Sequence, residues 1–557
     1  MWARNALFLG ICLVATLAIA DSLLRRDRIE RPATDIATDS TAESEANQLE
    51  TLARVNAEFR QSWEARGLSF TPRADDLTIA RRMSLALVGT VPSLEEIRAL
   101  EAMPAQQRIE WWTDHLLEDR RFSDYWAERL ARTYVGNDNG PFLVYRRRRF
   151  TMWLSDELYK NTPYDELVRK LIAEEGIWTG KPATNFITAS ADPNNDNQPD
   201  EIRLAGRTAR AFLGMRIDCL QCHDDKLGTI NLSSPGNIGS PENIHSGMQA
   251  DFHQLAAFFG PTEIRLVGVR DGKDPYRYKY LDAEKESIVP AKTPFLDNLA
   301  DGHGTRREQL ARWVTHPNNK PFARATVNRV WALLFGRPLL KPIDDIPLVA
   351  KFPPGMQLLA DDFVAHGYDL ERLIRLIVAS DAFQRDSRAD FAITPEHEEH
   401  WAAFPLTRLR PEQMAGSLVQ SSQLSTINGD AHVLLQIVKF AETGEFVERY
   451  GDIGEDEFNN RAGTIPQRLL MMNGNLVKER TGENFFSAAA IRIASLSRQP
   501  AKQIEVAYLA TLTRRPTRIE LSHFINRLTQ REETSRAQAM EDLYWTLINS
   551  TEFSWNH

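Results

Sequence analysis

Thr162-Pro163-Tyr164-Asp165-Glu166-Leu167-Val168-Arg169-Lys170-Leu171-Ile172 carries a complete helix signature. A threonine that can cap a helix is followed by a proline at the first helical position and by an acidic residue in the first turn. Leu167, Leu171 and Ile172 then recur at the spacing that places them on one face of an α-helix. The stretch therefore predicts an amphipathic helix over residues 164–175 that packs against a core.

The same kind of pattern extends in both directions from this stretch. Upstream, Ser93 and Glu96 form a predicted capping box before the apolar positions Ile97 and Leu100. Helices are predicted near 48–66, 75–87, 94–103, 106–118, 122–135, 147–160, 199–216 and 250–259, and again from about 305 to the end, except for an irregular stretch from Arg337 to Pro354. The fold class predicted from the sequence is mainly α, with many helices in two domains.

A short segment between the helical parts has a different pattern. Residues 263–270 and 276–280 alternate apolar and polar side chains, and Asp271-Gly272 lies between them. This alternation predicts a small β-hairpin insertion. The chain is thus divided into a helical domain at 48–260, a small β insertion or linker at 261–300, and a second helical domain at 301–557.

The composition is that of a globular protein with an acidic balance. The chain has 557 residues, 42% hydrophobic and 26% charged, with a formal net charge of -9. This charge argues against nucleic-acid binding by broad phosphate neutralisation. The one basic run, residues 146–149, is better explained as a solvated helix face or as ion-pair partners.

The N-terminus predicts export. Arg4 precedes an apolar run from Ala6 to Ala20 that ends in a small-x-small cleavage pattern. Residues 1–20 are therefore a signal peptide, or an N-terminal membrane anchor if the apolar segment extends through Leu24 uncleaved. Residues 21–47 are polar and acidic and are expected to form a disordered linker. The bulk of the chain is expected in the periplasm or outside the cell, free or anchored to a membrane by its N-terminus.

One motif indicates a specific chemistry. Cys219-Leu220-Gln221-Cys222-His223 has the C-x-x-C-H spacing of a c-type haem attachment site. Cys219 and Cys222 would form thioethers with the haem c vinyl groups, and His223 would be an axial ligand of the iron. The remaining cysteine, Cys12, lies in the N-terminal apolar segment.

Two other interpretations of the motif stay open. The cysteines could form a disulfide or a redox-active dithiol, with His223 as a bystander. They could also be half of a zinc site, which would need two further ligands. Candidates for a sixth iron ligand are Met215, His245, Met248, His253, Met471 and Met472, and the sequence does not select among them.

Acidic residues form further candidate sites. Asp224 and Asp225 follow His223 and could orient its ring or bond near a haem propionate, or serve as solvated turn residues. The loop that begins at Asp192 has part of a calcium-loop pattern, but it lacks the glycine and the bidentate glutamate, so an Asx-rich loop is favoured. The pairs Asp344-Asp345 and Asp361-Asp362 could act in glycosidic acid and base catalysis, although a structural role is favoured.

Several long segments resemble a known family. They are Ile79–Glu96, Arg121–Arg129, Phe212–Asp224 and Leu255–Phe259 in the first helical domain, and Leu310–Asn318, Asn328–Arg337, Asp369–Ile377, Ile465–Gly474 and Asn549–His557 in the second. These segments resemble the secreted cytochrome-associated proteins of planctomycetes, which carry a PSCyt-type domain followed by a PSD-type domain, both of unknown function. The resemblance implies export and helical domains at 48–260 and 301–557, and implies little about activity.

The chain departs from that family's pattern at two places. The family usually has a second histidine soon after the first, as C-H-D-H-P-F, where this chain has Asp225-Lys226-Leu227. The usual S-H-P after a double proline is also absent after Pro353-Pro354. A site built from additional histidines is therefore doubtful here.

Three functions follow from these observations. The leading one is an exported c-type haem protein that transfers electrons to or from a redox partner protein. The second is a secreted scaffold or binding protein without haem, linked to polysaccharide processing, in which a C-x-x-C disulfide staples a loop. The third is a metal-dependent hydrolase or oxidase with a metal at His223. Whether the chain is an enzyme, and whether it forms oligomers, are not decided by the sequence.

Overall fold

The computed structural model describes residues 31, 38–136, 144–191, 196–233, 244–281, 283–427, 458, 492–493, 496–529 and 533–557. Within these ranges no helix combines the length and the apolar composition needed to cross a membrane. The N-terminal segment 1–20 and Cys12 lie outside them, as does most of the predicted linker.

The first part of the chain is a series of helices joined by short turns. The helices are α2 (Thr38–Ala65), α3 (Asp76–Leu87), α4 (Leu94–Ala102), α5 (Arg108–Glu118), α6 (Arg120–Val135), α7 (Arg147–Tyr159), α8 (Tyr164–Ala173), α9 (Asn185–Thr188), α10 (Glu201–Thr208) and α11 (Gln249–Ala256). The described residues of this part also form short non-α helices: η1 (Pro182–Thr184), the π-helical turn η2 (Ala209–Leu213) and the 3₁₀ turn η3 (Asp218–Gln221). The mainly α prediction is confirmed.

The second part is also helical. It contains η5 (Asp297–Leu299), α12 (Arg306–Val314), α13 (Lys320–Phe335), α14 (Met356–Ala365), α15 (Leu370–Ala379), α16 (Asp381–Gln384), α17 (Pro395–Glu399), α18 (Pro411–Ser421), α23 (Pro500–Leu512), α24 (Arg518–Thr529) and α25 (Glu533–Ile548). The segment between α13 and α14 contains no helix, as predicted from its sequence.

The strands form small antiparallel pairs. They are β1 (Asn231–Ser233) with β2 (Ile244–Ser246), β3 (Thr262–Arg265) with β4 (Gly268–Asp271), β5 (Arg277–Tyr278) with β6 (Ser287–Ile288), and β7 (Thr407–Arg408) with β8 (Trp555–Asn556). The predicted β insertion is present, but the predicted pairing was wrong. Residues 263–270 fold back on themselves at Leu266-Val267, whose side chains are both exposed. Gly268 has a φ of 104°, and a glycine at this position allows the tight reversal.

Two helix limits differ from the prediction. Helix α2 begins at Thr38, well before the predicted start near 48, because acidic residues are compatible with the start of a helix. The helix predicted over 199–216 becomes π-helical at Ala209 and ends at Leu213. Gly214 ends it in the left-handed conformation, with a φ of 62°, and packs beside Ile346.

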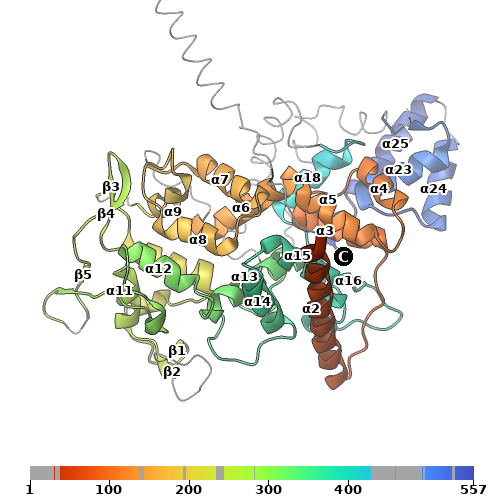
Figure 1. Ribbon diagram of the computed structural model, residues 1–557. Helices are drawn as coiled ribbons and strands as arrows, with labels where there is room; N and C mark the ends of the chain where they lie inside the picture. Colours follow the sequence, from red (N-terminus) through yellow and green to blue (C-terminus); the bar gives the residue numbers. More distant parts are fainter. Residues whose placement is uncertain are drawn as a thin grey trace, which may run out of the picture.

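One continuous core joins the two predicted helical domains. It extends from Val55 in α2 to Phe404 and includes buried side chains of α3, α5 to α8, α11 to α16 and η2. Helix α12 packs on α8, and α13 packs on η2, α14 and α3. Figure 1 shows α13 to α15 in the middle of the molecule, with α8, α11, α12 and the β3–β4 hairpin towards one end.

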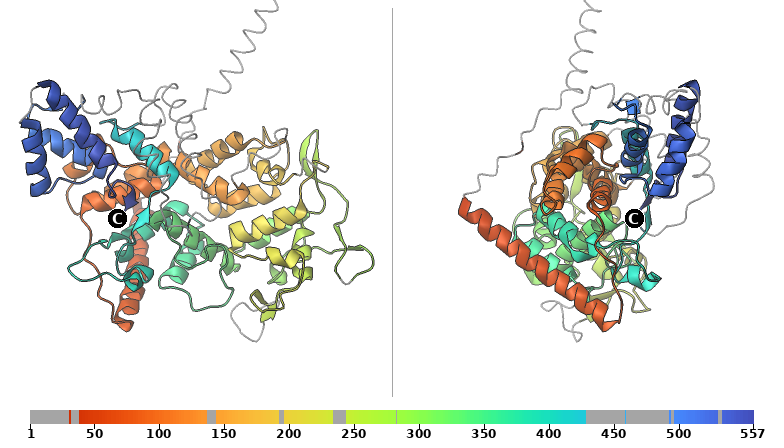
Figure 2. Two further views of the ribbon diagram at one scale, coloured as in Figure 1. Left: turned by 180° about the vertical axis from the view of Figure 1, so that it is seen from behind. Right: turned by 90° about the vertical axis from the view of Figure 1, so that its right-hand side faces the viewer.

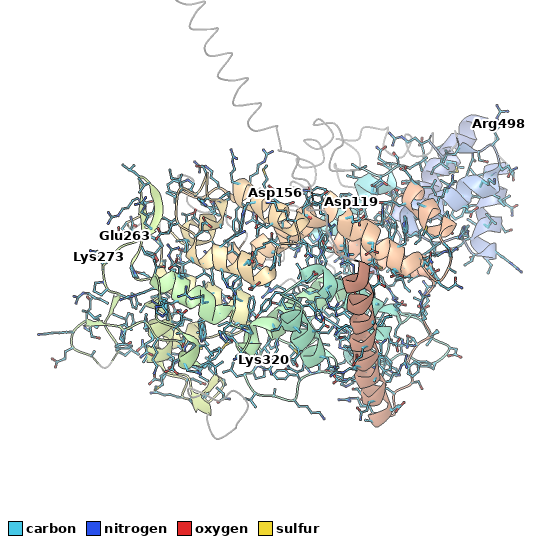
Figure 3. All side chains as sticks on the ribbon, in the orientation of Figure 1. Asp119, Asp156, Glu263, Lys273, Lys320 and Arg498 are labelled. Carbon is cyan, nitrogen blue, oxygen red and sulfur yellow. The ribbon has the colours of Figure 1, made fainter. Side chains whose placement is uncertain are left out.

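A second, smaller core lies at the other end. It combines Leu94 and Ile97 of α4 with apolar side chains of α18, α23, α24 and α25. Figure 3 shows the two ends clearly, with Glu263 and Lys273 at the hairpin end and Arg498 at the opposite end. The smaller core therefore joins an early part of the chain, α4, to its last described helices.

Helix α3 is tied to the end of the chain by a buried arginine. Arg82 is fully buried, and its Nε donates a hydrogen bond of 2.7 Å to the carbonyl oxygen of His557, the last residue. Its Nη1 donates to the carbonyl oxygens of Phe383 at 3.0 Å and Arg385 at 2.6 Å. Figure 1 has the C-terminus next to the label of α3, and both views of Figure 2 show it within the body of the molecule. Burial lowers the pKa of Arg82 to about 9.

Candidate functional site

The C-x-x-C-H motif lies on an exposed turn. Cys219 belongs to the 3₁₀ turn η3, and the backbone N–H of Cys222 donates to the carbonyl oxygen of Cys219 at 3.2 Å. Both thiols are free and exposed, whereas Leu220 between them is fully buried. The turn thus anchors itself with one apolar side chain and presents both sulfur atoms to solvent.

His223 continues the exposed surface of the turn. Its Nδ1 lies 2.9 Å from the carbonyl oxygen of Asp224, which can only accept a hydrogen bond, so Nδ1 carries the proton. Among the described residues, Nε2 has no hydrogen-bond partner. An Nδ1–H donated to a backbone carbonyl and a free Nε2 lone pair is the arrangement that prepares a histidine to bind a metal ion.

A buried polar network supports the turn from below. The carbonyl oxygen of Gln221 accepts hydrogen bonds from Gln249 Nε2 and His253 Nε2, both at 3.0 Å, and from the Tyr278 hydroxyl at 3.2 Å. The donors come from α11 and from β5, and η3 packs directly on α11. Three donors on one carbonyl oxygen fix the middle of the C-x-x-C turn.

His253 lies at the centre of this network. The side chain is fully buried, the Tyr276 hydroxyl is 2.8 Å from Nδ1, and the ring stacks on Tyr278 with centroids 3.4 Å apart. Since Nε2 donates to Gln221, Nδ1 accepts from Tyr276 in the neutral tautomer. Burial lowers the pKa of His253, and only the bond to the Gln221 carbonyl opposes this effect.

The structure separates the sixth-ligand candidates. His253 is engaged at both ring nitrogens, and Met215 is buried in the large core. Met248 is 47% exposed and directly precedes Gln249, whose side chain contacts the turn. The side chain of His245, and Met471 and Met472 entirely, lie outside the described residues.

The acids beside His223 act on the backbone. The Asp224 carboxylate accepts from the backbone N–H of Gln249 at 2.7 Å, and it is the Asp224 carbonyl that orients His223. The Asp225 carboxylate accepts from the backbone N–H groups of Leu227 and Ile230, and these bonds lower its pKa. Burial raises the pKa of the Cys219 thiol, and the charges of Asp225 and Asp218 add to the effect.

The other acidic candidates have structural contacts. Asp362 accepts two hydrogen bonds from Arg372 at 2.9 and 3.0 Å, and Asp344 pairs with Arg216 at 2.8 Å. Asp361 bonds to Lys320, and Asp345 has its pKa raised by burial. Of the predicted Asx-rich loop, residues 192–195 lie outside the described residues. In the part of the chain that the structure describes, no three histidine, cysteine or acidic side chains come together as a metal site.

The comparisons with known proteins concern two long regions. Residues 54–234 match the family model PSCyt2, "Protein of unknown function (DUF1549)", and residues 306–443 match PSD1, "Protein of unknown function (DUF1553)". The chain belongs to the tandem PSCyt2–PSD1 family. The predicted resemblance is thereby confirmed. No curated protein and no solved structure matches the chain.

The site of this PSCyt2–PSD1 protein uses residues outside both matched regions. The C-x-x-C-H motif lies within the PSCyt2 region, but Gln249, His253, Tyr276 and Tyr278 lie between the two regions. The sequence offered His253 as one of several candidates for a sixth iron ligand, and it did not show that His253 supports the C-x-x-C turn. The alternation of tyrosines over 276–280 was the available signal, because it places Tyr276, Tyr278 and Tyr280 on one side of a strand.

Proposed function

We propose that this protein is an exported c-type haem protein that carries one haem at Cys219, Cys222 and His223 and transfers electrons. The observation that carries this proposal is the joint exposure of two free thiols and of an imidazole whose Nε2 has no described partner, all on one turn. A haem bound there would supply one-electron redox chemistry.

The donor set fits such a group. Thioether attachment requires two reduced cysteines, and both thiols are free. Axial ligation requires a neutral histidine with an available nitrogen, and the Asp224 carbonyl holds His223 in the tautomer that leaves Nε2 available. The hydrogen bonds of the Gln221 carbonyl limit movement of the turn, which favours a small reorganisation on electron transfer.

A redox-active dithiol is less well supported by the same turn. Catalytic cysteines have lowered pKa values, because the thiolate is the nucleophile. Here burial and the neighbouring acids raise the pKa of Cys219. The acidic net charge of the chain, -9, suits a basic redox partner.

The proposal is tested by producing the full-length protein in a host that attaches c-type haem. We expect a reduced-minus-oxidised visible spectrum with haem bands and a positive pyridine haemochrome assay for a covalently bound haem. Cys219→Ala should abolish the covalent haem, and Lys226→Ala, an exposed substitution on the same loop, should keep it. A colourless protein from the haem-attaching host, with Cys219 joined to Cys222 in a disulfide, would contradict the proposal and favour a stapled scaffold protein.

A further inference from the structure

A cavity of about 60 Å³ lies where the PSCyt2 and PSD1 regions meet. It is bordered by α6, by α10 and its continuation η2, and by α13, and Figure 1 shows α6 and α13 near the middle of the molecule. Its charged lining consists of Arg132, Arg207, Arg210, Arg329 and Asp344. Arg132 pairs with Glu412 at 2.7 Å and Arg210 pairs with Asp218 at 3.4 Å, so the charge that remains to be accounted for is that of Arg329.

Arg329 of α13 is the buried member of this group. Its exposed fraction is 8%, its Nη1 donates to the Thr133 hydroxyl at 3.1 Å, and its Nη2 is 3.5 Å from the carbonyl oxygen of Arg210. Among the described residues no carboxylate lies within ion-pair distance of the guanidinium. A buried charge normally has a partner of opposite charge, because its removal from water costs several kcal/mol.

The surroundings of Arg329 do not neutralise it. Tyr134 and Tyr164, whose hydroxyls are 2.9 Å apart, lie on its inner side, and burial raises the pKa of both phenols, so they stay uncharged. Burial also lowers the pKa of Arg329 itself, and the charge of Asp344, which lines the same cavity without contacting Arg329, opposes this effect. The side chains packed near the guanidinium group of Arg329 inside the protein are therefore uncharged.

Each acid near the cavity pairs with an arginine other than Arg329. Asp344 pairs with Arg216, which does not line the cavity, at 2.8 Å. Arg210 pairs with Asp218 at 3.4 Å at the partly exposed side of the cavity. The cavity thus keeps an excess of positive charge at Arg329 and has space beside it.

We propose that this cavity binds a tetrahedral oxyanion, phosphate or sulfate, with Arg329 as its buried contact and Arg210 beside it. Guanidinium groups bind such oxyanions through paired N–H donors. Two guanidinium groups from different helices can approach a tetrahedral group from different sides, whereas a planar carboxylate offers its acceptors in one plane. The volume corresponds to about four water-sized spheres, which matches a small oxyanion and excludes a ligand the size of haem. The proposal is independent of the turn at Cys219.

The test measures anion binding to the full-length protein by calorimetry and by thermal unfolding at constant ionic strength. The probes are inorganic phosphate, inorganic sulfate, methyl phosphate and acetate, with chloride as the balancing ion. We expect saturable binding of phosphate or sulfate and at least tenfold weaker binding of acetate. If methyl phosphate binds as tightly as inorganic phosphate, the ligand is a phosphate group on a larger molecule. If methyl phosphate binds at least tenfold more weakly than inorganic phosphate, the ligand is the free anion.

Two variants and one control locate the binding site. Arg329→Gln should weaken binding at least tenfold, whereas Arg324→Gln on the same helix should not, because Arg324 bonds to Gln357 and to the Leu348 carbonyl. If Arg329→Gln does not fold, Arg210→Gln, at a partly exposed position, provides the same comparison. Absence of saturable binding to the wild-type protein, or equal binding by a folded Arg329 or Arg210 variant, would overturn the proposal.

Discussion

His253 Nε2 donates a hydrogen bond of 3.0 Å to the carbonyl oxygen of Gln221, one of the two residues between the cysteines of the C-x-x-C motif. A fully buried histidine on α11 therefore controls the position of an exposed turn. The second ring nitrogen of His253 accepts from the Tyr276 hydroxyl, so both nitrogens are engaged in hydrogen bonds.

Replacing His253 with phenylalanine tests the contribution of this network to stability. The variant keeps a ring that can stack on Tyr278 but loses both hydrogen bonds, and it leaves the Tyr276 hydroxyl without its partner. The free energy of unfolding should fall by about 1 to 3 kcal/mol, measured by urea unfolding of the full chain. His303→Phe, at an exposed position, should change it by less than about 0.5 kcal/mol.

The same histidine gives a prediction about pH. Burial lowers the pKa of His253 in the folded protein, so the unfolded chain binds the proton first as the pH falls. The contribution of His253 is then present above about pH 6.5, the ordinary pKa of histidine, and is lost progressively below it. The difference in unfolding free energy between wild type and His253→Phe should shrink from pH 7.5 to pH 5. A constant or growing difference over this range would contradict the lowered pKa.

Glu96 should be a second source of acid sensitivity. Burial opposes its ionisation, but the hydrogen bond from His115 and the charge of Arg121 outweigh burial and lower its pKa to about 2. Its stabilising effect is present above the ordinary pKa of about 4.5 and is lost as the pH falls towards 2. Glu96→Gln should lower the free energy of unfolding by about 2 kcal/mol at pH 7. The loss is smaller than that expected for a buried arginine left without any carboxylate, because Asp119 still bonds Arg121.

The matched control for Glu96 is Glu110→Gln, at an exposed position of the neighbouring helix α5. Urea unfolding at pH 7 and pH 3 should show the loss for Glu96→Gln mainly at pH 7. An equal loss at both pH values would mean that the charge of Glu96 does not stabilise the fold.

Gly268 should tolerate no side chain. Its φ is 104°, and an added Cβ would lie 2.1 Å from the backbone of Gly176, which pairs with Val269. Gly268→Ala should therefore cost about 3 kcal/mol or more, from backbone strain and the clash together. Gly302→Ala, with a φ of 69° and open space around it, should cost only about 1 kcal/mol. Both variants place an alanine at a positive φ, but only Gly268→Ala also adds a clash, so the difference between their melting temperatures measures the clash. An equal fall in the two melting temperatures would mean that the clash contributes nothing.

Met248 is the sixth-ligand candidate that the described residues favour, a prediction that depends on the proposed haem. In the haem-loaded protein, Met248→Leu should lower the reduction potential and change the ferric absorption spectrum, because a thioether ligand raises the potential. Met215→Leu, a volume-conserving change in the core, should alter neither property. Unchanged spectra for Met248→Leu would direct attention to His245.

The helical signals in the sequence were strong because they were local. The capping box at Ser93 and Glu96 is present, and α8 begins at Tyr164 as predicted. The predicted cap of α8 was wrong, because Pro163 lies at the N-cap position and the Thr162 hydroxyl bonds to Glu157 instead. The pairing of β3 with β4 was missed because Leu266 and Val267 look like strand residues, although they form the exposed reversal. An alternating pattern alone does not show whether a short run of residues forms one strand or folds back into a hairpin.

The candidate site was only half predictable for the same reason. The spacing of Cys219 and Cys222 is a local property, so the motif could be read directly. The three donors to Gln221 come from residues 28 to 57 positions away, and their meeting depends on how α11 packs under η3. The arginines around the cavity come from three separate helices, and no sequence pattern brings Arg329 next to Thr133.

The hydrogen bond from Arg82 to the carbonyl oxygen of His557 has a consequence for synthesis in the cell. Helix α3 is made early, yet the carbonyl oxygens that its buried arginine bonds belong to residues 301 to 475 positions later in the chain. The guanidinium group therefore lacks these partners until residues 383–557 have been synthesised. A partly made chain that has not reached this point should be more open to proteases around α3 than the folded protein is.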